Sequence, residues 1–455
     1  MNFPEVNSLF PARSRLWAAG AALLLAVVPA RAGVAEGIQH GTVAGFDVYV
    51  DHTAVQELVV VRGYFPAGDV FNPPDNPALA ALTAGMLDKG TTTHTKLALA
   101  RQLEGMGATI SFGADSEVLS FSARCLRGDL PVVVALLAEQ FRTPAFAPEE
   151  FAKYQKQMIG ALKRRLDNPS ARADEAFARA IFPAGHPNRP ATVDELIAAV
   201  QTTKPEDLRA FHAAHYGPAH LKLVAVGDVD QGELATALQK GFTGWTGGSA
   251  QPTSVAKAAG VDAANDQTVF IPGKTSVNLV MGQATGLRYR DADSLALRAG
   301  TAILGSGFTG RLMSTVRDRE GLTYGIGAGV SDDSYVDGSF QVQATFAPSL
   351  LERGVTSTRR EVNKWWQDGV TDAELDARKV NLVGSFQVGL ATTDGLAQNI
   401  LTALQREVGP EWLDLYPSRV QSLTTAQVNT AIKKYLDPQK MVLIKAGTVG
   451  QGTAP

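Results

Sequence analysis

The chain has 455 residues, which is too long for one ordinary hydrophobic core and indicates about two to four domains. Its hydrophobic share of 45% and charged share of 19% are those of a folded globular protein and exclude a disordered chain. A net charge of -3, with 42 Lys and Arg and no basic block interleaved with aromatic residues, argues against a nucleic-acid binder.

Residues 1–32 have the pattern of a secretory signal peptide. Arg13 and Arg15 precede an apolar run over 16–28, and Ala30-Arg31-Ala32 has the small-x-small form that signal peptidases recognise. The run is short for a membrane span, and the alternative interpretation is an uncleaved membrane anchor. We expect cleavage near Ala32 and a soluble, periplasmic protein that is not bound to the membrane.

The first half of the mature chain predicts an α+β domain. Period-2 patterns predict strands at 48–50, 58–65, 108–112 and 118–125, and helical patterns cover 78–87, 97–106, 130–141 and 149–166. This order predicts a mainly antiparallel sheet with helices packed on one face. The single cysteine, Cys125, ends a strand and has no His near it in sequence, so a buried inert thiol is favoured over a nucleophile.

A duplication is visible on either side of the Gly-, Pro-, Ala- and Ser-rich stretch 243–266, which shows no sustained apolar period and predicts a linker. The expected divisions are a first domain, a linker and a second domain, at 33–245, 246–266 and 267–455. Three pairs of segments resemble each other: 147–156 and 370–379, 200–208 and 420–428, and 221–227 and 441–447. A repeat of this length indicates two homologous domains rather than a solenoid.

Two further segments bear on function. The first is a predicted helix that contains Ala81-Leu82-Thr83-Ala84-Gly85 and continues as Met86-Leu87-Asp-Lys-Gly90-Thr91. The second, in the other half, reads Gly310-Arg-Leu-Met-Ser-Thr-Val-Arg-Asp-Arg-Glu-Gly-Leu-Thr-Tyr324. Together with the duplication and the linker, they make the chain resemble the M16 (pitrilysin-like, mitochondrial-processing-peptidase-like) zinc peptidases over residues 38 to 448. The resemblance implies two α/β-sandwich domains of the LuxS/MPP-like metallohydrolase fold.

For the first segment the resemblance implies that catalysis is lost. In that family an inverted H-x-x-E-H motif precedes Met-Leu, two residues and Gly-Thr. The two His bind zinc from one helix face, and the Glu activates water. Here the ligand positions hold Ala81 and Gly85, and the base position holds Ala84. The third ligand, a Glu about 75 residues beyond the second His, falls on Gly160 or Ala161, so we expect no metal in this chain.

For the second segment the resemblance implies a retained function. Arg317 and Tyr324 match an Arg and a Tyr, seven residues apart, that reach the zinc site of another domain in that family. There the Tyr hydroxyl stabilises the oxyanion, and the Arg holds a substrate carbonyl, as fixed donors in a dry cavity can do. The alternative is a solvated helix residue, Arg317, and a packed strand residue, Tyr324.

The combination implies a non-catalytic subunit of a heterodimeric peptidase. A zinc-bearing M16 partner would contribute the metal, and this chain would contribute Arg317 and Tyr324 for hydrolysis of an extended peptide bound by strand addition. Two alternatives stay open. One is a structural or assembly protein, like the M16 relatives that serve as core subunits of a respiratory complex. The other is a peptide-binding protein that acts without a partner.

Two other patterns are weighed against function. Gly305, Gly307 and Gly310 satisfy G-x-G-x-x-G, but they follow a predicted helix at 294–304 instead of a strand, which argues against a dinucleotide loop. His212 and His215 lie three apart on a probable helix with no carboxylate nearby. Two structural imidazoles are therefore favoured over a shared ligand.

Overall fold

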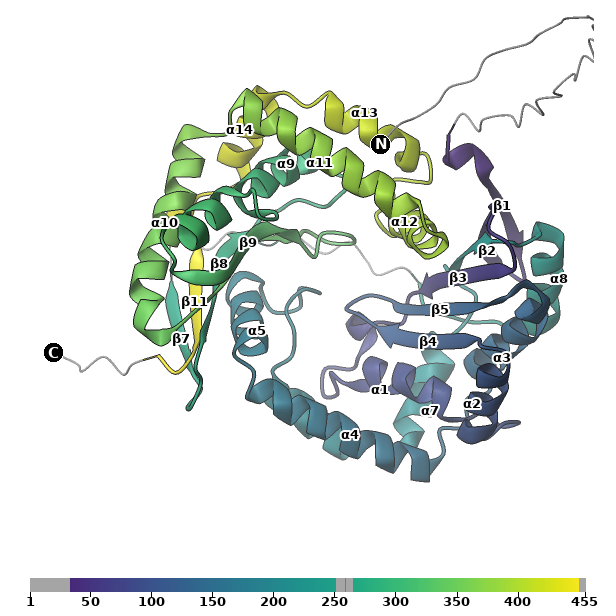
Figure 1. Cartoon of the computed structure of the whole chain (residues 1–455). Coiled ribbons are helices and arrows are strands. Elements are labelled where there is room, and N and C mark those ends of the chain that lie inside the picture. The colour runs from purple at the N-terminus through teal and green to yellow at the C-terminus, as the bar shows by residue number, and fades with distance from the viewer. Residues whose placement is uncertain (1–32, 251–257, 259–264, 450–455) are drawn as a thin grey trace, which may run out of the picture. The chain divides into compact units, whose positions relative to one another are not determined.

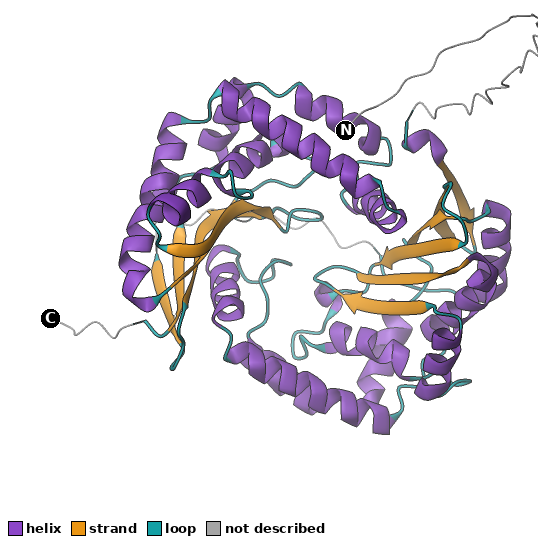
Figure 2. Ribbon diagram, viewed as in Figure 1, coloured by secondary structure: helices purple, strands orange, loops and turns teal. Residues whose placement is uncertain are grey.

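Two sheets with their helices form the part of the chain that the computed structural model describes, namely residues 33–250, 258 and 265–449. Figure 1 follows the chain through these elements, and Figure 2 shows how helices and strands gather in each half. The proposed signal peptide, residues 1–32, lies outside the described residues. None of the helices within the described part is long and apolar enough to cross a membrane.

The first sheet has six strands in the order β1-β2-β6-β3-β5-β4. All neighbouring strands are antiparallel except β2 and β6. The strands are β1 Ile38–Val43, β2 Phe46–His52, β3 Leu58–Phe65, β4 Thr109–Ala114, β5 Leu119–Leu126 and β6 Lys222–Gly227. The α-helices of this half are α1 Leu79–Met86, α2 Lys96–Gly105, α3 Leu130–Arg142, α4 Pro148–Leu166, α5 Pro169–Ile181, α6 Val193–Thr202, α7 Pro205–His215 and α8 Gln231–Phe242. Short 3₁₀ turns lie at Ala35–Gly37, Asp69–Phe71, Leu87–Lys89 and Arg127–Asp129.

The second sheet has five strands in the order β7-β11-β8-β10-β9. Its strands are β7 Asp266–Phe270, β8 Val277–Ala284, β9 Thr323–Ser331, β10 Ser339–Phe346 and β11 Val442–Gly447. Its helices are α9 Ser294–Gly305, the π-helix η5 Met313–Arg319, α10 Leu351–Asp368, α11 Asp372–Leu390, α12 Thr393–Gln405, α13 Trp412–Gln421 and α14 Thr425–Tyr435. Two 3₁₀ turns lie at Pro348–Leu350 and Pro438–Lys440.

The two sheets share one topology. In the first sheet the last strand of the half, β6, is parallel to β2 and antiparallel to β3. In the second sheet the last strand, β11, is likewise parallel to β7 and antiparallel to β8. Each sheet then ends in an antiparallel pair, β5 with β4 or β10 with β9. The repeated segments at 147–156 and 370–379 begin α4 and α11, and those at 221–227 and 441–447 form β6 and β11. The predicted fold class, two homologous α+β domains, is confirmed.

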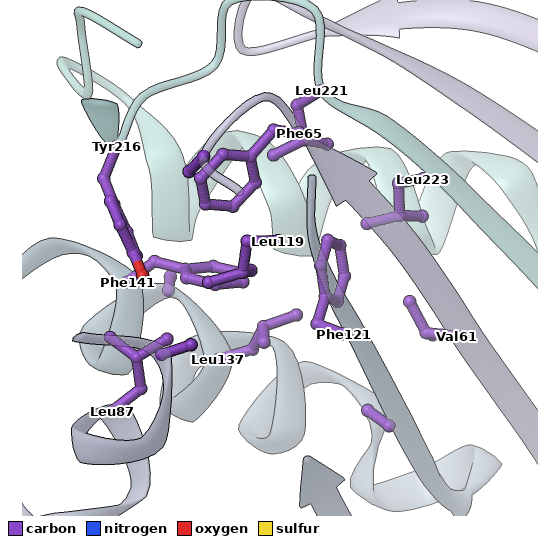
Figure 3. Close-up of a cluster of buried hydrophobic side chains, with 14 of the residues drawn as sticks. Val61, Phe65, Leu87, Leu119, Phe121, Leu137, Phe141, Tyr216, Leu221 and Leu223 are labelled. Atoms are coloured by element: carbon purple, nitrogen blue, oxygen red, sulfur yellow. The ribbon is translucent and has the colours of Figure 1, made fainter. Parts of the chain in front are cut away.

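Each sheet buries one face under helices of its own half. In the first half this core contains the aromatic contact between Phe65 and Phe141, whose ring centroids are 5.4 Å apart, with Tyr216 packed edge-on against Phe65. Figure 3 shows these three side chains converging from a strand, a helix and the end of another helix. Cys125 on β5 is buried in the same core, and burial raises the pKa of its thiol to about 12. The expectation of an inert thiol therefore agrees with its surroundings.

The opposite face of each sheet is covered by a helix from the other half, which the sequence-based picture of helices on one face did not include. α12 packs on β3 and β6, and α5 packs on β8 and β11. The two resulting apolar clusters join Ile400 and Leu401 to Val60 and Val224, and Phe177 to Val280 and Ile444. Because both faces of the central strands are buried, β6 has a continuous apolar run with no polar alternation.

Most predicted elements match the observed ones within a few residues. The helix expected at 78–87 is α1 followed by a 3₁₀ turn, and the helix expected at 149–166 is α4. The opening strand β1 has no continuous apolar pattern, since its burial alternates irregularly, and it was not predicted. The predicted domain limits stay a prediction, since most of the stretch 251–264 lies outside the described residues.

Candidate functional site

The three positions of the erased zinc motif lie on the short helix α1. Leu82, Ala84 and Met86 are buried in the first core, whereas Ala81 and Gly85 are half-buried. α1 contacts β4, α4, α6, α7 and the 3₁₀ turn Asp69–Phe71, so that it is enclosed by elements of its own half. The helix therefore packs as a structural element although its polar positions have been replaced.

Tyr154 of α4 fills the space beside Gly85. A Cβ atom built on Gly85 would lie 2.0 Å from the Tyr154 hydroxyl oxygen and 2.4 Å from the ring carbon that carries it. Such a separation is far inside van der Waals contact, so no side chain fits at position 85 unless Tyr154 moves. Burial raises the pKa of Tyr154, and the Lys89 ammonium lies 5.6 Å from its ring centroid.

The counted positions of the third ligand, Gly160 and Ala161, lie further along the same helix, α4. The predicted positions of the third ligand therefore lie on a helix that contacts α1. Neither position offers a donor atom, and within the described residues no group of three His, Cys, Asp or Glu side chains could hold a metal ion. A zinc ion does not fit this set of side chains, because the set contains no donors and Tyr154 occupies the space where one ligand would stand.

The histidines of this half form separate hydrogen bonds. His212 Nε2 lies 2.7 Å from the Phe141 carbonyl oxygen, and His215 Nδ1 lies 2.6 Å from Ser249 Oγ. Burial lowers the pKa of both imidazoles. His94 is half-buried, with Nδ1 2.9 Å from Glu139 Oε1. Each imidazole thus contacts its own partner.

Arg317 and Tyr324 are brought together in the second half. Arg317 is on the π-helix η5, whose wide turn is seen in the 3.0 Å hydrogen bond from Glu320 N to Thr315 O, and Tyr324 is the second residue of β9. The Arg317 guanidinium carbon lies 5.4 Å from the Tyr324 ring centroid, within the range of a cation–π contact. Tyr324 is 89% exposed. The alternative of a packed strand residue is therefore wrong for Tyr324.

Phe308 completes this cluster and was missed in the sequence. Its ring centroid lies 5.3 Å from the Arg317 guanidinium carbon, and the side chain is 71% exposed. Phe308 belongs to the glycine-rich segment that links α9 to η5. Gly305 closes that segment against β9, because a Cβ there would lie 2.1 Å from the Ala328 backbone nitrogen. The sequence offered one signal for Phe308, namely that a large aromatic residue stands within the glycine-rich pattern.

An ion pair fixes the start of the Arg317 helix. Arg311 donates from Nε and from one terminal nitrogen to the two oxygens of Glu374, both over 2.7 Å, and also to the Gly369 carbonyl oxygen. Glu374 also forms a capping box with Thr371 at the start of α11. These contacts, with Arg311 named first among the causes, lower the pKa of Glu374 to about 2.

β9 is the edge strand of the second sheet, and a groove runs along it. The groove has a volume of about 630 Å³ and is lined by β8, β9 and β10, the loop after α9, and Ser170 and Asp174 of α5, so it lies over one face of the sheet. Gly325, Gly327 and Gly329 face it, and Cβ atoms on Gly325 and Gly329 would meet nothing within 4 Å. The absence of side chains at alternate positions leaves open space over β9. Because β9 is the last strand of the sheet, its second edge pairs with no described strand, and such an edge can accept an added strand.

Models of one peptidase family match both halves of the chain. The model described as insulinase (peptidase family M16) matches residues 48–190, and the model described as the peptidase M16 inactive domain matches residues 203–382. Among curated proteins, an uncharacterised zinc protease of Streptomyces coelicolor is 25% identical over 335 residues, 72% of either chain. A non-peptidase homologue of Helicobacter pylori is 22% identical over 385 residues, 82% of this chain and 85% of its own.

Solved structures show the same fold. A peptidase M16 inactive domain from Pseudomonas fluorescens superposes with a TM-score of 0.83 at 24% identity, covering 92% of this chain and 100% of its own. The periplasmic protease PqqL of Escherichia coli superposes with a TM-score of 0.75 at 17% identity, covering 98% of this chain and 49% of its own. With both halves matched by models of one family, this chain belongs to the M16 peptidase family.

Proposed function

We propose that this chain is the non-catalytic subunit of a two-subunit M16 peptidase and supplies Arg317 and Tyr324 to the zinc-bearing site of a partner. The observation that carries the proposal is the contrast between the two halves. The motif positions on α1 are packed and lack donors, whereas Arg317 and Tyr324 are stacked together and Tyr324 is almost fully exposed. A donor that is aligned and still exposed can act on a group that this chain does not itself contain.

The chemistry assigned to the pair is stabilisation of charge. The Tyr324 hydroxyl forms no hydrogen bond with any described residue, so it is free to donate to an oxyanion that forms at a peptide carbonyl. Arg317 contacts both the Phe308 and the Tyr324 ring, which limits its rotation, and its Nη1 lies 3.6 Å from Asp318 Oδ1. Water activation would take place in the partner subunit.

The substrate class is a peptide in extended form. The open edge of β9 and the groove beside it would hold such a peptide by backbone hydrogen bonds, with little demand on its side chains. Tyr324 lies at the start of this strand, so a peptide added to β9 would run past the proposed oxyanion donor. We also place the protein in the periplasm, where the structurally similar PqqL is described.

The test is reconstitution with an M16 protein that carries H-x-x-E-H. The isolated chain should contain no stoichiometric zinc by metal analysis and should not cleave peptides, and mixing should restore cleavage. In the assembled complex Tyr324→Phe should lower kcat by about 10²–10³-fold while the complex still elutes intact. The matched control is Tyr435→Phe, which removes a hydroxyl bonded to Asp293 outside the cluster and should leave kcat unchanged.

Two outcomes would contradict the proposal. One tightly bound zinc per isolated chain would remove its basis. Full activity of Tyr324→Phe in an intact complex would instead support a structural or assembly role. That second function is favoured by the packing of Tyr154 over Gly85 and by the similarity to a relative named as a non-peptidase homologue.

A further inference from the structure

A second cavity lies within the second half, behind the end of β9. It has a volume of about 330 Å³ and is enclosed by α9, β9, α11, α12 and α13. Ser306, Ala328, Gly329 and Val330 line both this cavity and the groove along β9. The two spaces are therefore neighbours, and a chain lying along β9 would pass the cavity.

The cavity carries more positive than negative charge. Arg298 and Arg406 line it, and no Asp or Glu appears among the described residues around it. Arg298 forms an ion pair with Asp333, but its buried Nε has no hydrogen-bond partner. Arg406 donates from Nε to Ser334 Oγ over 3.4 Å, and no carboxylate within the described part of the chain forms an ion pair with it.

Arg406 thus has no ion pair of its own among the described residues, and Asp333, whose charge acts on it, is already paired with Arg298. Burial, followed by the nearby charge of Arg298, lowers the pKa of the Arg406 guanidinium in spite of the opposing effects of Tyr289 and Asp333. A guanidinium stays protonated under all ordinary conditions, so the charge persists in the cavity. A bound anion with two oxygens would match its planar donors.

The walls of the cavity are aromatic. Tyr289 lies with its ring centroid 3.7 Å from the Arg406 guanidinium carbon and 4.8 Å from that of Arg298. Trp412 and Tyr416 have ring centroids 5.8 Å apart. These stacking contacts offer an alternative role, in which Arg406 only supports the packing of Tyr289. A ligand suited to this lining has an anionic end and an apolar body.

The position of the cavity on β9 relates it to the proposed oxyanion donor. Tyr324 and Gly329 are on the same strand, and a separation of five residues corresponds to about 17 Å in an extended chain. A peptide that reached Tyr324 would therefore place a residue about five positions away beside the cavity.

We propose that this cavity is a subsite for a carboxylate of an extended peptide, bound by Arg406 with the Arg298 Nε and held between Tyr289 and Trp412. The assignment deepens the proposed function by naming a carboxylate of the peptide as a group that is recognised, and its peptide part rests on that function. The carboxylate belongs to an acidic side chain or to the peptide's C-terminus, two sources with the same chemistry.

The experiment uses the isolated chain, so that it does not depend on a partner. Binding of 3-phenylpropionate and of its uncharged amide is compared by calorimetry and by fluorescence, since Trp412 lines the cavity. The carboxylate should bind about 10- to 100-fold more tightly, as expected for hydrogen bonds to a charged group. Arg406→Gln should abolish this preference. Arg419→Gln, which removes a guanidinium stacked on Trp412 outside this cavity, should preserve it.

Peptide pairs then separate the two sources. One pair differs by Glu or Gln at an internal position, and the other by a free or amidated C-terminus. A preference for the charged member of either pair that is lost in Arg406→Gln supports the subsite and identifies the source. Equal binding of acid and amide by the wild-type chain would overturn it, and a preference that persists in Arg406→Gln would assign Arg406 to packing. Since Tyr324→Phe should leave this binding unchanged, failure of the peptidase proposal is recognised separately.

Discussion

Helix α1 in the first half and the segment 305–324 in the second differ in how their side chains are used. On α1 the motif positions are small, and Tyr154 occupies the space that a ligand at Gly85 would need. In 305–324 the side chains of Phe308 and Tyr324 are largely exposed and add little to folding. The motif positions of α1 therefore serve packing, whereas the exposed side chains of the second region are available for the contact with a partner that we propose.

Substitutions in the two regions should therefore have opposite effects. Substitutions on α1 should lower the free energy of unfolding without changing catalysis by the complex. Substitutions of the exposed residues Phe308 and Tyr324 should lower activity at nearly constant stability. Measurements of the free energy of unfolding and of kcat test this difference.

The largest effect on stability is expected for Gly85→His. The new side chain must displace Tyr154, and overpacking of this kind costs about 1–3 kcal/mol, measured as the free energy of unfolding in urea. Tyr154→Ala in the same chain should recover part of the loss, because the two residues compete for one space and their effects are not additive. Ala81→His, half-buried on the same helix, is the matched control. If Gly85→His leaves the free energy of unfolding unchanged, α1 is not closely packed at this position.

A smaller effect is expected at the ion pair that positions η5. Glu374→Gln keeps the capping box but loses the charge facing Arg311, and should cost about 1 kcal/mol at pH 7. The pKa of Glu374 is lowered to about 2, so its stabilisation is present above its unfolded value, near 4.5, and is lost as the pH falls toward 2. The difference in the free energy of unfolding between the wild type and Glu374→Gln should therefore shrink to zero as the pH falls from about 4.5 to about 2.

The control for this pair is Asp368→Asn, which removes an exposed ion pair with Lys364. It should change the free energy of unfolding by less than about 0.5 kcal/mol. If both variants behave alike across the pH range, Glu374 has no special role in holding the Arg317 helix.

The smallest effect on stability is expected for Phe308→Ala. The side chain is exposed, so the free energy of unfolding should change by less than about 0.5 kcal/mol, while kcat of the reconstituted complex should fall because Arg317 loses one of its two stacking partners. If Phe308→Ala lowers the free energy of unfolding but not kcat, the cluster of Phe308, Arg317 and Tyr324 contributes to folding, as α1 does.

Much of the fold could be predicted because its signals are local. Strand alternation and helical periodicity placed α1, α4, β3 and β5, and the repeated segments predicted two homologous domains. The Arg317–Tyr324 pair was identified from one continuous segment, and the structure places the two side chains 5.4 Å apart as guanidinium carbon to ring centroid. Their role toward a partner stays a prediction.

What the sequence by itself determined is which donors are missing: Ala81, Ala84 and Gly85 cannot bind a metal in any fold, and neither can Gly160 or Ala161. Only the tertiary structure decided what replaced them, because Tyr154 reaches Gly85 from a helix far along the chain. It also decided that α5 and α12 each cover the sheet of the other half. The amphipathic pattern of a helix predicts that one of its faces is buried. It does not predict against which surface, because that depends on contacts between residues distant in sequence. The cavity around Arg406 is hidden for the same reason, since five elements meet to form it.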